Sequence, residues 1–127
     1  MLNNAFVMAT LPAEDIKRAV KFYTEKLGLK QLDSPEEGSA IFEAGDGSQI
    51  YMYQRARTKA EHTAATFGVD DLEATVKSLS ARGVKFEQYD MGPIKTNELG
   101  IAEDGNTKAA WLTDPEGNIL AIVSRGS

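Results

Sequence analysis

The side chains that most often bind metal ions or act as nucleophiles are nearly absent from this chain of 127 residues. It has one histidine, His62, and no cysteine. The lack of cysteine excludes disulfides, thiol catalysis and zinc–thiolate sites. Histidine is the side chain type that changes its charge close to neutral pH, so His62 is the first candidate for proton transfer or metal binding.

A metal site built around His62 would need carboxylates from other parts of the chain, because one imidazole does not hold a divalent ion alone. The alternative is a histidine at the end of a strand, hydrogen-bonded or exposed to solvent. The acidic residues that could complete a displaced metal site are Glu61, Glu98, Glu103 and Asp104.

Several residues could carry out acid–base chemistry without a metal, but their spacing does not require any two of them to lie close together. Tyr51 or Tyr53 could donate a proton, and Lys95 or Glu98 could close over a substrate. None of these residues is spaced so that two of them must lie together. Asp71 and Asp114 are predicted to be a helix cap and a turn residue, because aspartate at such positions accepts hydrogen bonds from nearby backbone N–H groups.

The elements that must position these side chains occur twice in the sequence. Asp15-Ile16 and Asp71-Leu72 lie 56 positions apart, and each pair opens a segment with apolar residues at helical spacing. Each predicted helix ends at a glycine, Gly28 in the first half and Gly83 in the second. The sequence therefore indicates a tandem repeat of one structural module.

Runs of apolar and β-branched residues predict four strands in each half, in the order βαβββ. Each sheet can bury one face under its own helix and leave the other face free, so the predicted fold class is α+β, with two modules that are each a curved mixed sheet with one helix. The predicted strands are Ala5–Leu11, ended by Pro12, then Lys30–Leu32, Ala40–Glu43, Gln49–Gln54, Thr63–Val69, Val84–Glu87, Lys108–Thr113 and Ile119–Val123.

A long connection, about Gln88–Thr107, distinguishes the second half from the first. Irregular loops of about 20 residues are uncommon in compact domains unless they act as lids or binding loops. Gly92-Pro93, Gly100 and Gly105 would supply hinges. The alternative is a disordered surface insertion.

Size and charge limit the class of protein. The chain is long enough for one globular domain, 1–127, with modules at about 1–58 and 59–127. A net charge of −5 and scattered basic residues argue against nucleic acid or an anionic membrane as partner. No signal peptide and no membrane-spanning run are recognisable, so we expect a soluble cytoplasmic protein.

Several motifs together resemble the vicinal oxygen chelate superfamily, which includes glyoxalase I, bleomycin-resistance proteins, fosfomycin-resistance enzymes and extradiol dioxygenases. The resemblance covers nearly the whole chain and implies the paired βαβββ fold. Its motifs are Asp15 with Phe22-Tyr23 and Leu27-Gly28, Val69-x-Asp71-Leu72, and Asp114-Pro115-x-Gly117-Asn118.

In metal-using members of that superfamily, the first and last strand of each module supply one His, Glu or Gln each. Carried over by spacing from the helix-capping aspartates and the glycine turns, these positions fall on Met8, Tyr51, Ala64 and Ala121. Such residues do not form a hard divalent site, which needs imidazole or carboxylate. The resemblance therefore implies a fold whose metal site has been lost, with no cofactor.

Strand alternation turns further residues toward the same cleft between the modules, and the resemblance adds Trp111. The lining would suit a flat or moderately apolar organic ligand, although the same aromatic residues could simply fill the core. The residues expected to bind a ligand are Met8, Thr10, Tyr51, Tyr53, His62, Ala64, Thr66, Trp111 and Ala121, with Ile119 and Val123 beside Ala121.

Three functions remain open at this point. The preferred one is a metal-independent protein that binds a small molecule and, by resemblance to drug-sequestering members, forms a homodimer. The second is a glyoxalase-like lyase or isomerase, or a dioxygenase, that uses a divalent metal through His62. The third is an interaction module with a filled core and no ligand. The fold alone does not choose among them.

Overall fold

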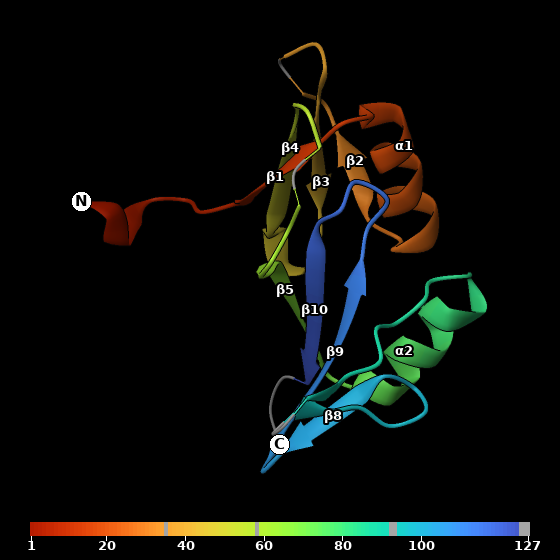
Figure 1. Cartoon of the computed structure of the whole chain (residues 1–127). Helices are drawn as coiled ribbons and strands as arrows, with labels where there is room; N and C mark the ends of the chain where they lie inside the picture. Colours follow the sequence, from red (N-terminus) through yellow and green to blue (C-terminus); the bar gives the residue numbers. More distant parts are fainter. Residues whose placement is uncertain (35, 58, 92–93, 125–127) are drawn as a thin grey trace. The chain divides into compact units, whose positions relative to one another are not determined.

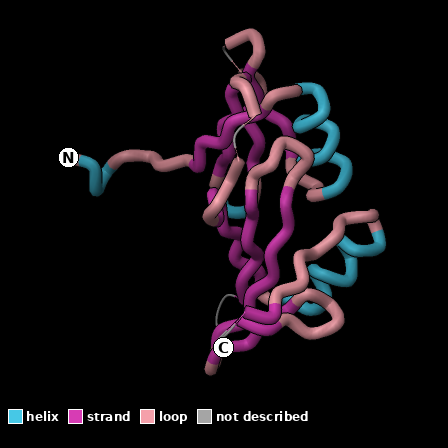
Figure 2. Tube along the Cα trace, viewed as in Figure 1, coloured by secondary structure: helices cyan, strands magenta, loops and turns pink. Residues whose placement is uncertain are grey.

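The computed structural model describes residues 1–34, 36–57, 59–91 and 94–124. The chain divides into two compact units, Met1–Thr58 and Lys59–Ser127. Each unit contains a four-stranded mixed sheet with a helix against one face (Figures 1 and 2). This confirms the predicted α+β fold with two βαβββ modules in tandem.

The sheet of the first unit has the strand order β1-β4-β3-β2. Strand β1 runs parallel to β4, and the other neighbours are antiparallel. The elements of this unit, in chain order, are η1 (Leu2–Asn4), β1 (Ala9–Ala13), α1 (Ile16–Lys21), η2 (Phe22–Lys26), β2 (Lys30–Leu32), β3 (Ser39–Glu43), η3 (Gly45–Gly47) and β4 (Gln49–Gln54).

The helix of the first unit begins and ends as its sequence predicts. The carboxylate of Asp15 accepts a hydrogen bond from the backbone N–H of Arg18 at 3.1 Å, which caps α1. After Lys21 the helix widens into the π-helical turn η2, which the sequence did not indicate. Gly28, at φ 76°, then ends the helix. The helix buries Tyr23, whose ring stacks on Phe42 of β3 with centroids 5.2 Å apart.

The prediction of the first strand was wrong at both ends. β1 starts at Ala9, and residues 1–8 run away from the sheet, with Leu2, Phe6 and Val7 exposed (Figure 1). The reason is that β4, its partner, begins only at Gln49. Pro12 does not end the strand but lies within it. β1 is the outer strand of this sheet, and proline is tolerated in outer strands because its missing N–H need not enter the ladder.

The sheet of the second unit has the corresponding order, β5-β10-β9-β8, and β5 runs parallel to β10. Asp71 caps α2 by accepting a hydrogen bond from the N–H of Ala74 at 3.0 Å. No helix in the described part of the chain is long and apolar enough to cross a membrane. The elements of this unit are β5 (Thr63–Val69), α2 (Leu72–Ala81), β6 (Asp90–Met91), β7 (Ile94–Lys95), β8 (Ile101–Asp104), β9 (Thr107–Thr113) and β10 (Ile119–Ser124).

The long connection of the second unit is not an irregular loop. It contains the two-stranded hairpin β6–β7, and it supplies β8, the outer strand of the main sheet. The predicted strand Val84–Glu87 is reduced to one bridge, between Phe86 and Leu112 of β9. β8 occupies the edge of β9 at Thr107–Ala110, so the segment near Phe86 pairs only with the far end of that strand.

Two of the predicted hinge glycines lie in hydrogen-bonded turns. Gly100, at φ 90°, donates its N–H to the carbonyl of Asn97 at 3.0 Å. The Asn97 side chain accepts hydrogen bonds from the N–H groups of Leu99 and Ile101, which fixes the start of β8. Gly105 opens the two-residue turn between β8 and β9. The third predicted hinge, Gly92-Pro93, lies outside the described residues.

The turn between β9 and β10 confirms that Asp114 has a structural role. Its carboxylate is buried and accepts hydrogen bonds from the N–H of Glu116 at 2.9 Å and from the N–H of Asn118 at 2.8 Å. The Asn118 side chain donates a third hydrogen bond at 2.9 Å. This network fixes where β10 begins.

Candidate functional site

Each sheet has a face that its own helix does not cover, called here the helix-free face. In the first unit, Leu11, Ala13, Ile50 and Met52 are buried on the helix side. The residues that alternate with them point the other way. The helix-free face of this unit therefore carries Thr10 and Pro12 of β1, Ser39 and Ile41 of β3, and Tyr51 and Tyr53 of β4.

The register of β1 and β4 brings three of the predicted site residues together. Thr10 lies opposite Tyr51, and Pro12 lies opposite Tyr53. Thr10 is exposed and both tyrosines are half-buried. Met8 precedes β1 and is half-buried, outside the ladder. Thr10, Tyr51 and Tyr53 thus form a polar and aromatic surface within one unit.

Tyr51 is held as a neutral hydrogen-bond donor. Its hydroxyl donates to the carboxylate of Glu36 at 3.1 Å. Burial raises the pKa of the Tyr51 phenol, and the hydrogen bond to Glu36 and the negative charge of Glu36 raise it further. A phenol in this state donates a hydrogen bond and does not offer an anionic oxygen to a ligand.

The second unit repeats this arrangement with smaller residues. Thr66 of β5 lies opposite Ala121 of β10, which in turn lies opposite Trp111 of β9. The Thr66–Ala121 pair has the place that Thr10–Tyr51 has in the first unit, since each joins the first and last strand of its module. Thr66 is exposed, Trp111 is half-buried, and Ala121 is 5% exposed. These three predicted site residues therefore share one row across three strands.

A β-bulge separates Ala64 from that row. Thr63 pairs with Ile119 and Ala65 pairs with Leu120, so Ala64 is the extra residue on β5. Ala64 is exposed, as is His62, which lies in a bend before β5. Because the bulge interrupts the alternation, the two-residue spacing of His62 and Ala64 does not place them on the same face.

Of the carboxylates proposed as partners of His62, Glu61 is its neighbour in the chain, and the other three belong to the turn before β8 or to β8 itself. Glu98 is in the turn before β8, and Glu103 forms an ion pair with Lys108 at 3.2 Å. Among the residues that the structure describes, no three His, Cys, Asp or Glu side chains gather in a group that could hold a metal ion.

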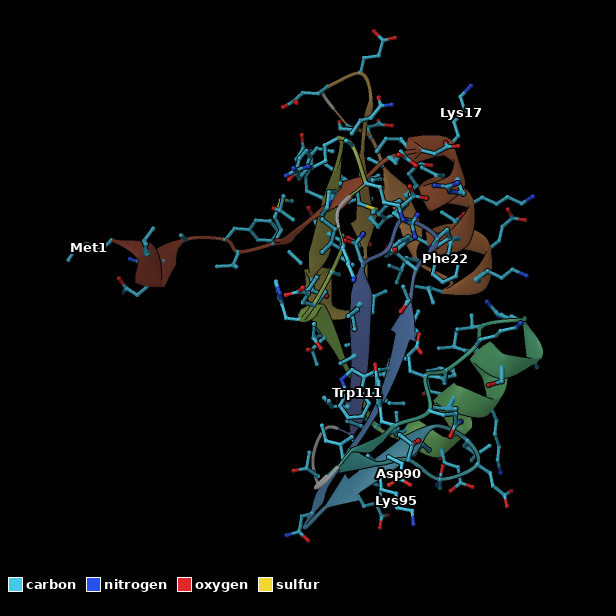
Figure 3. All side chains as sticks on the ribbon, viewed as in Figure 1. Met1, Lys17, Phe22, Asp90, Lys95 and Trp111 are labelled. Carbon is cyan, nitrogen blue, oxygen red and sulfur yellow. The ribbon has the colours of Figure 1, made fainter. Side chains whose placement is uncertain are left out.

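Two functional candidates were missed by sequence reasoning, Tyr89 and Glu87, and both lie beside Trp111. The rings of Tyr89 and Trp111 meet edge to face with centroids 5.5 Å apart. The N–H of Glu87 donates to the carbonyl of Trp111 at 2.8 Å, and its carboxylate accepts a hydrogen bond from Thr113 at 2.9 Å. Figure 3 shows the Trp111 side chain on the side of the strands away from α2.

Tyr89 is positioned by the base of the β6–β7 hairpin. Its N–H donates to the hydroxyl of Thr96 at 2.9 Å, and the N–H of Thr96 donates to its carbonyl, also at 2.9 Å. Burial raises the pKa of Tyr89, and the negative charge of Glu87 adds to the effect, so these two side chains interact. The sequence signal that could have found Tyr89 is that it is the one aromatic residue of the connection Gln88–Thr107.

The structure thus groups the predicted residues within units: Thr10, Tyr51 and Tyr53 in the first, and Thr66, Trp111 and Ala121 in the second. Among the described residues, it places His62 in no group of three or more His, Cys, Asp or Glu side chains that could hold a metal ion. That residues of both helix-free faces line a common cleft stays a prediction.

Comparisons with known proteins agree with this architecture. A probable lactoylglutathione lyase from Vibrio parahaemolyticus is 28% identical over 97% of this chain and 92% of its own length. A lactoylglutathione lyase from Haemophilus influenzae is 29% identical over 89% of this chain and 87% of its own length. The crystal structure of a glyoxalase/bleomycin resistance protein/dioxygenase from Alicyclobacillus acidocaldarius matches with a TM-score of 0.73 at 18% identity, over 98% of this chain and 93% of that one.

The family model described as Glyoxalase/Bleomycin resistance protein/Dioxygenase superfamily matches residues 5–122, which is nearly the whole chain. The matched range includes α1, α2, the Asp114 turn and both sheets apart from the last two residues of β10. The chain therefore belongs to the glyoxalase/bleomycin resistance protein/dioxygenase superfamily.

Proposed function

We propose that this protein binds a small, flat organic molecule between its two modules without using a metal ion. The single observation that carries the proposal is the pair of equivalent register positions at Tyr51 and Ala121, next to Thr10 and Thr66. They are last-strand positions, where metal-using members of the superfamily supply a ligand. Here one position has a phenol and the other a methyl group.

The residues at the four expected ligand positions do not fit a divalent metal. Ala64 and Ala121 have no donor atom, and Met8 offers only a soft thioether. The Tyr51 phenol has a raised pKa and donates a hydrogen bond to Glu36, so it is not a ready anionic ligand. We therefore assign no reaction step to a metal at these positions.

The helix-free faces support a role for the same surfaces in ligand binding. They present aromatic rings at Tyr51, Tyr53 and Trp111, and hydroxyls at Thr10 and Thr66. Aromatic walls with a few polar groups are typical of sites for small organic molecules. We propose that Met8, Ala64 and Ala121 contribute to the same site, and that His62 lies at its margin.

The relatives named lactoylglutathione lyase favour a second candidate, a lyase that uses a divalent metal through His62. In that case a metal would polarise substrate oxygens. Against it, His62 is exposed, and Glu103, one of its proposed partners, is already paired with Lys108. The third candidate, an interaction module without a ligand, is favoured by no particular contact in the described residues.

Metal content of protein purified without chelator or affinity tag separates the first two candidates. Titration with Ni²⁺, Zn²⁺, Mn²⁺ and Fe²⁺, followed by thermal unfolding, should show no stoichiometric binding and no stabilisation. One tightly bound ion per chain that is lost in His62→Ala would overturn the proposal in favour of the lyase. Quenching of Trp111 fluorescence by aromatic compounds then tests for ligand binding, and a complete lack of quenching would favour the interaction module.

The assembly and location that accompany this function are also proposals. We propose a homodimer, as the resemblance to drug-sequestering members implies, and a cytoplasmic location. Light scattering coupled to size-exclusion chromatography tests the first, with twice the chain mass of 13.8 kDa expected. Fractionation of the native host tests the second.

A further inference from the structure

A corner made by three side chains of the second unit, Trp111, Tyr89 and Glu87, adds a charge to the aromatic surface. Trp111 projects from β9 on the helix-free face, and Tyr89 meets its ring edge to face, with centroids 5.5 Å apart. Both rings are half-buried, so part of each remains accessible to solvent. Aromatic faces carry negative electrostatic potential and attract cations placed over them.

The Glu87 carboxylate lies on the same side of β9 as the Trp111 ring. It accepts a hydrogen bond from the Thr113 hydroxyl at 2.9 Å, and Thr113 lies two residues beyond Trp111 on the strand, so both point to the same face. Its charge also acts on the phenol of Tyr89. The carboxylate and the two rings thus border one small region.

The charge of Glu87 has no cationic partner among the residues that the structure describes. The ion pairs found there include those of Arg18 with Glu14, Lys77 with Glu73, and Lys108 with Glu103. The nearby hairpin carries one charge of each sign, Asp90 directly opposite Lys95 in the register (Figure 3). The corner therefore combines two aromatic rings with a carboxylate for which no ion pair is found among the described residues.

The positions beside the corner on the same face of the sheet carry mostly small side chains. Trp111 lies opposite Ala121, and Ala109, two residues before it, lies opposite both Ala102 and Val123. Thr66 and Gly68 follow on β5. Thr66 and Gly68 are exposed, so a planar ring can approach the aromatic pair from the side of β5.

We propose that this corner selects a planar organic cation, such as a protonated or quaternary nitrogen heterocycle, as the ligand of the protein. The rings of Trp111 and Tyr89 supply stacking and cation–π attraction, and Glu87 supplies the counter-charge. The inference rests on the proposed function and specifies the chemical class of its ligand. It also assigns a binding role to Tyr89 and Glu87.

Three probes of the same ring size test the charge preference: N-methylquinolinium, neutral quinoline at mildly alkaline pH, and quinoline-2-carboxylate. Binding is measured by isothermal titration calorimetry, and quenching of Trp111, the one tryptophan, reports binding near the corner. We expect N-methylquinolinium to bind about tenfold more tightly than quinoline. The carboxylate should bind most weakly, since it meets the charge of Glu87.

Substitutions at Glu87 and Tyr89 test whether the corner causes this preference. Glu87→Gln keeps a hydrogen-bond acceptor for Thr113 but removes the charge, and it should weaken binding of the cation about three- to tenfold while leaving quinoline unchanged. The matched control is Glu73→Gln, on α2, which changes the net charge equally and should have no effect. Tyr89→Phe should retain binding of both probes, whereas Tyr89→Ala should weaken binding of both.

The outcomes distinguish a failure of the proposed cation preference from a failure of the proposed binding of flat organic molecules. Equal binding of N-methylquinolinium and quinoline, with Trp111 quenching by both, would overturn the charge preference and leave the proposed function standing. An equal effect of Glu87→Gln and Glu73→Gln would also overturn the role of the corner. Absence of binding by all three probes would overturn both the cation inference and the proposed binding of flat organic molecules.

Discussion

Gly100 packs so closely on Phe86 that a Cβ atom at position 100 would lie 2.8 Å from the Cβ of Phe86. Real Cβ atoms do not approach other atoms so closely, and φ at Gly100 is 90°, a value that side chains disfavour. The contact joins the turn before β8 to the segment that pairs with the end of β9.

Replacing Gly100 with alanine should destabilise the protein by about 3 kcal/mol, because strain and a steric clash act together. Gly105→Ala is the matched control. Position 105 has φ 63°, and a Cβ added there would meet no atom within 4 Å, so this variant should cost only the strain, about 1 kcal/mol. Urea unfolding of both variants checks the difference, and equal costs would contradict the role of the contact with Phe86.

The cap of α2 gives a second prediction. Asp71→Ala removes the acceptor for the N–H of Ala74 and should lower the free energy of unfolding by about 1 kcal/mol. The neighbouring Asp70 is exposed and lies outside the helix, so Asp70→Ala changes the charge equally without removing the cap. Chemical denaturation of the two variants should separate them, and identical curves would argue against the cap.

Asp114 should be among the most sensitive positions for stability. Its buried carboxylate accepts hydrogen bonds from two backbone N–H groups and from the Asn118 side chain. Asp114→Ala would leave these donors without that acceptor and should cost about 3 kcal/mol or more. Thermal unfolding measures the loss. A variant as stable as the parent would refute the structural role and reopen a role for Asp114 in ligand binding.

The raised pKa of Tyr51 leads us to expect that the stability of the protein falls in a particular alkaline pH range. Its folded-state pKa is raised by burial and by Glu36, so the folded protein holds the phenolic proton more tightly than the unfolded chain does. The resulting stability is fully present below about pH 10, the ordinary tyrosine value, and is lost as pH rises through the folded pKa. Tyr51→Phe should therefore lose less stability than the parent in this alkaline range.

Glu36→Gln tests the cause of that shift. It removes the negative charge near Tyr51 and should lower the Tyr51 pKa toward the ordinary value, although burial still raises it. Ultraviolet absorbance of tyrosinate, compared with the Tyr51→Phe variant, identifies the titration of this residue. An unchanged titration in Glu36→Gln would show that burial alone accounts for the shift.

The assignment of lost ligand positions can be tested by restoring them. A variant with Met8→His, Tyr51→Glu, Ala64→His and Ala121→Glu carries imidazole and carboxylate at all four positions, and it should bind Ni²⁺ or Zn²⁺ where the parent does not. Ala121 is nearly fully buried, so a carboxylate there should destabilise the metal-free variant, and metal should restore stability. A folded variant that binds no metal would show that the four positions do not meet.

Much of the fold could be predicted from the sequence, because its signals are local. Asp15 and Asp71 start helices through contacts three residues away, and Gly28 ends one through its own φ angle. The strands Gln49–Gln54 and Thr63–Val69 were predicted to the residue because alternation marks half-buried strands. The same alternation predicted that Thr10 and Thr66 point toward the cleft, whereas their pairing with Tyr51 and Ala121 is known only from the strand register.

What was missed depends on contacts between distant residues. β8 has only four residues, with alanine and two acidic residues among them, so its composition resembles a loop, and only pairing with β9 makes it a strand. Tyr89 contacts Trp111, which lies 22 positions later in the sequence. The β6–β7 hairpin that follows Tyr89 was not indicated by any local sequence pattern. The bulge at Ala64 arises where β5 and β10 pair, and therefore it could not be seen in either strand alone.

The division of the long connection into a hairpin and a paired outer strand separates two kinds of sequence change. Substitutions or insertions in the hairpin that carries Tyr89 can reshape the aromatic corner and leave every pairing of the main sheet in place. Changes in the turn of Asn97 and Gly100, or in β8, act on the edge of the sheet itself. Diversification toward new ligands is therefore expected to concentrate in the hairpin, and a library for altered selectivity should vary the hairpin and keep 97–104 constant.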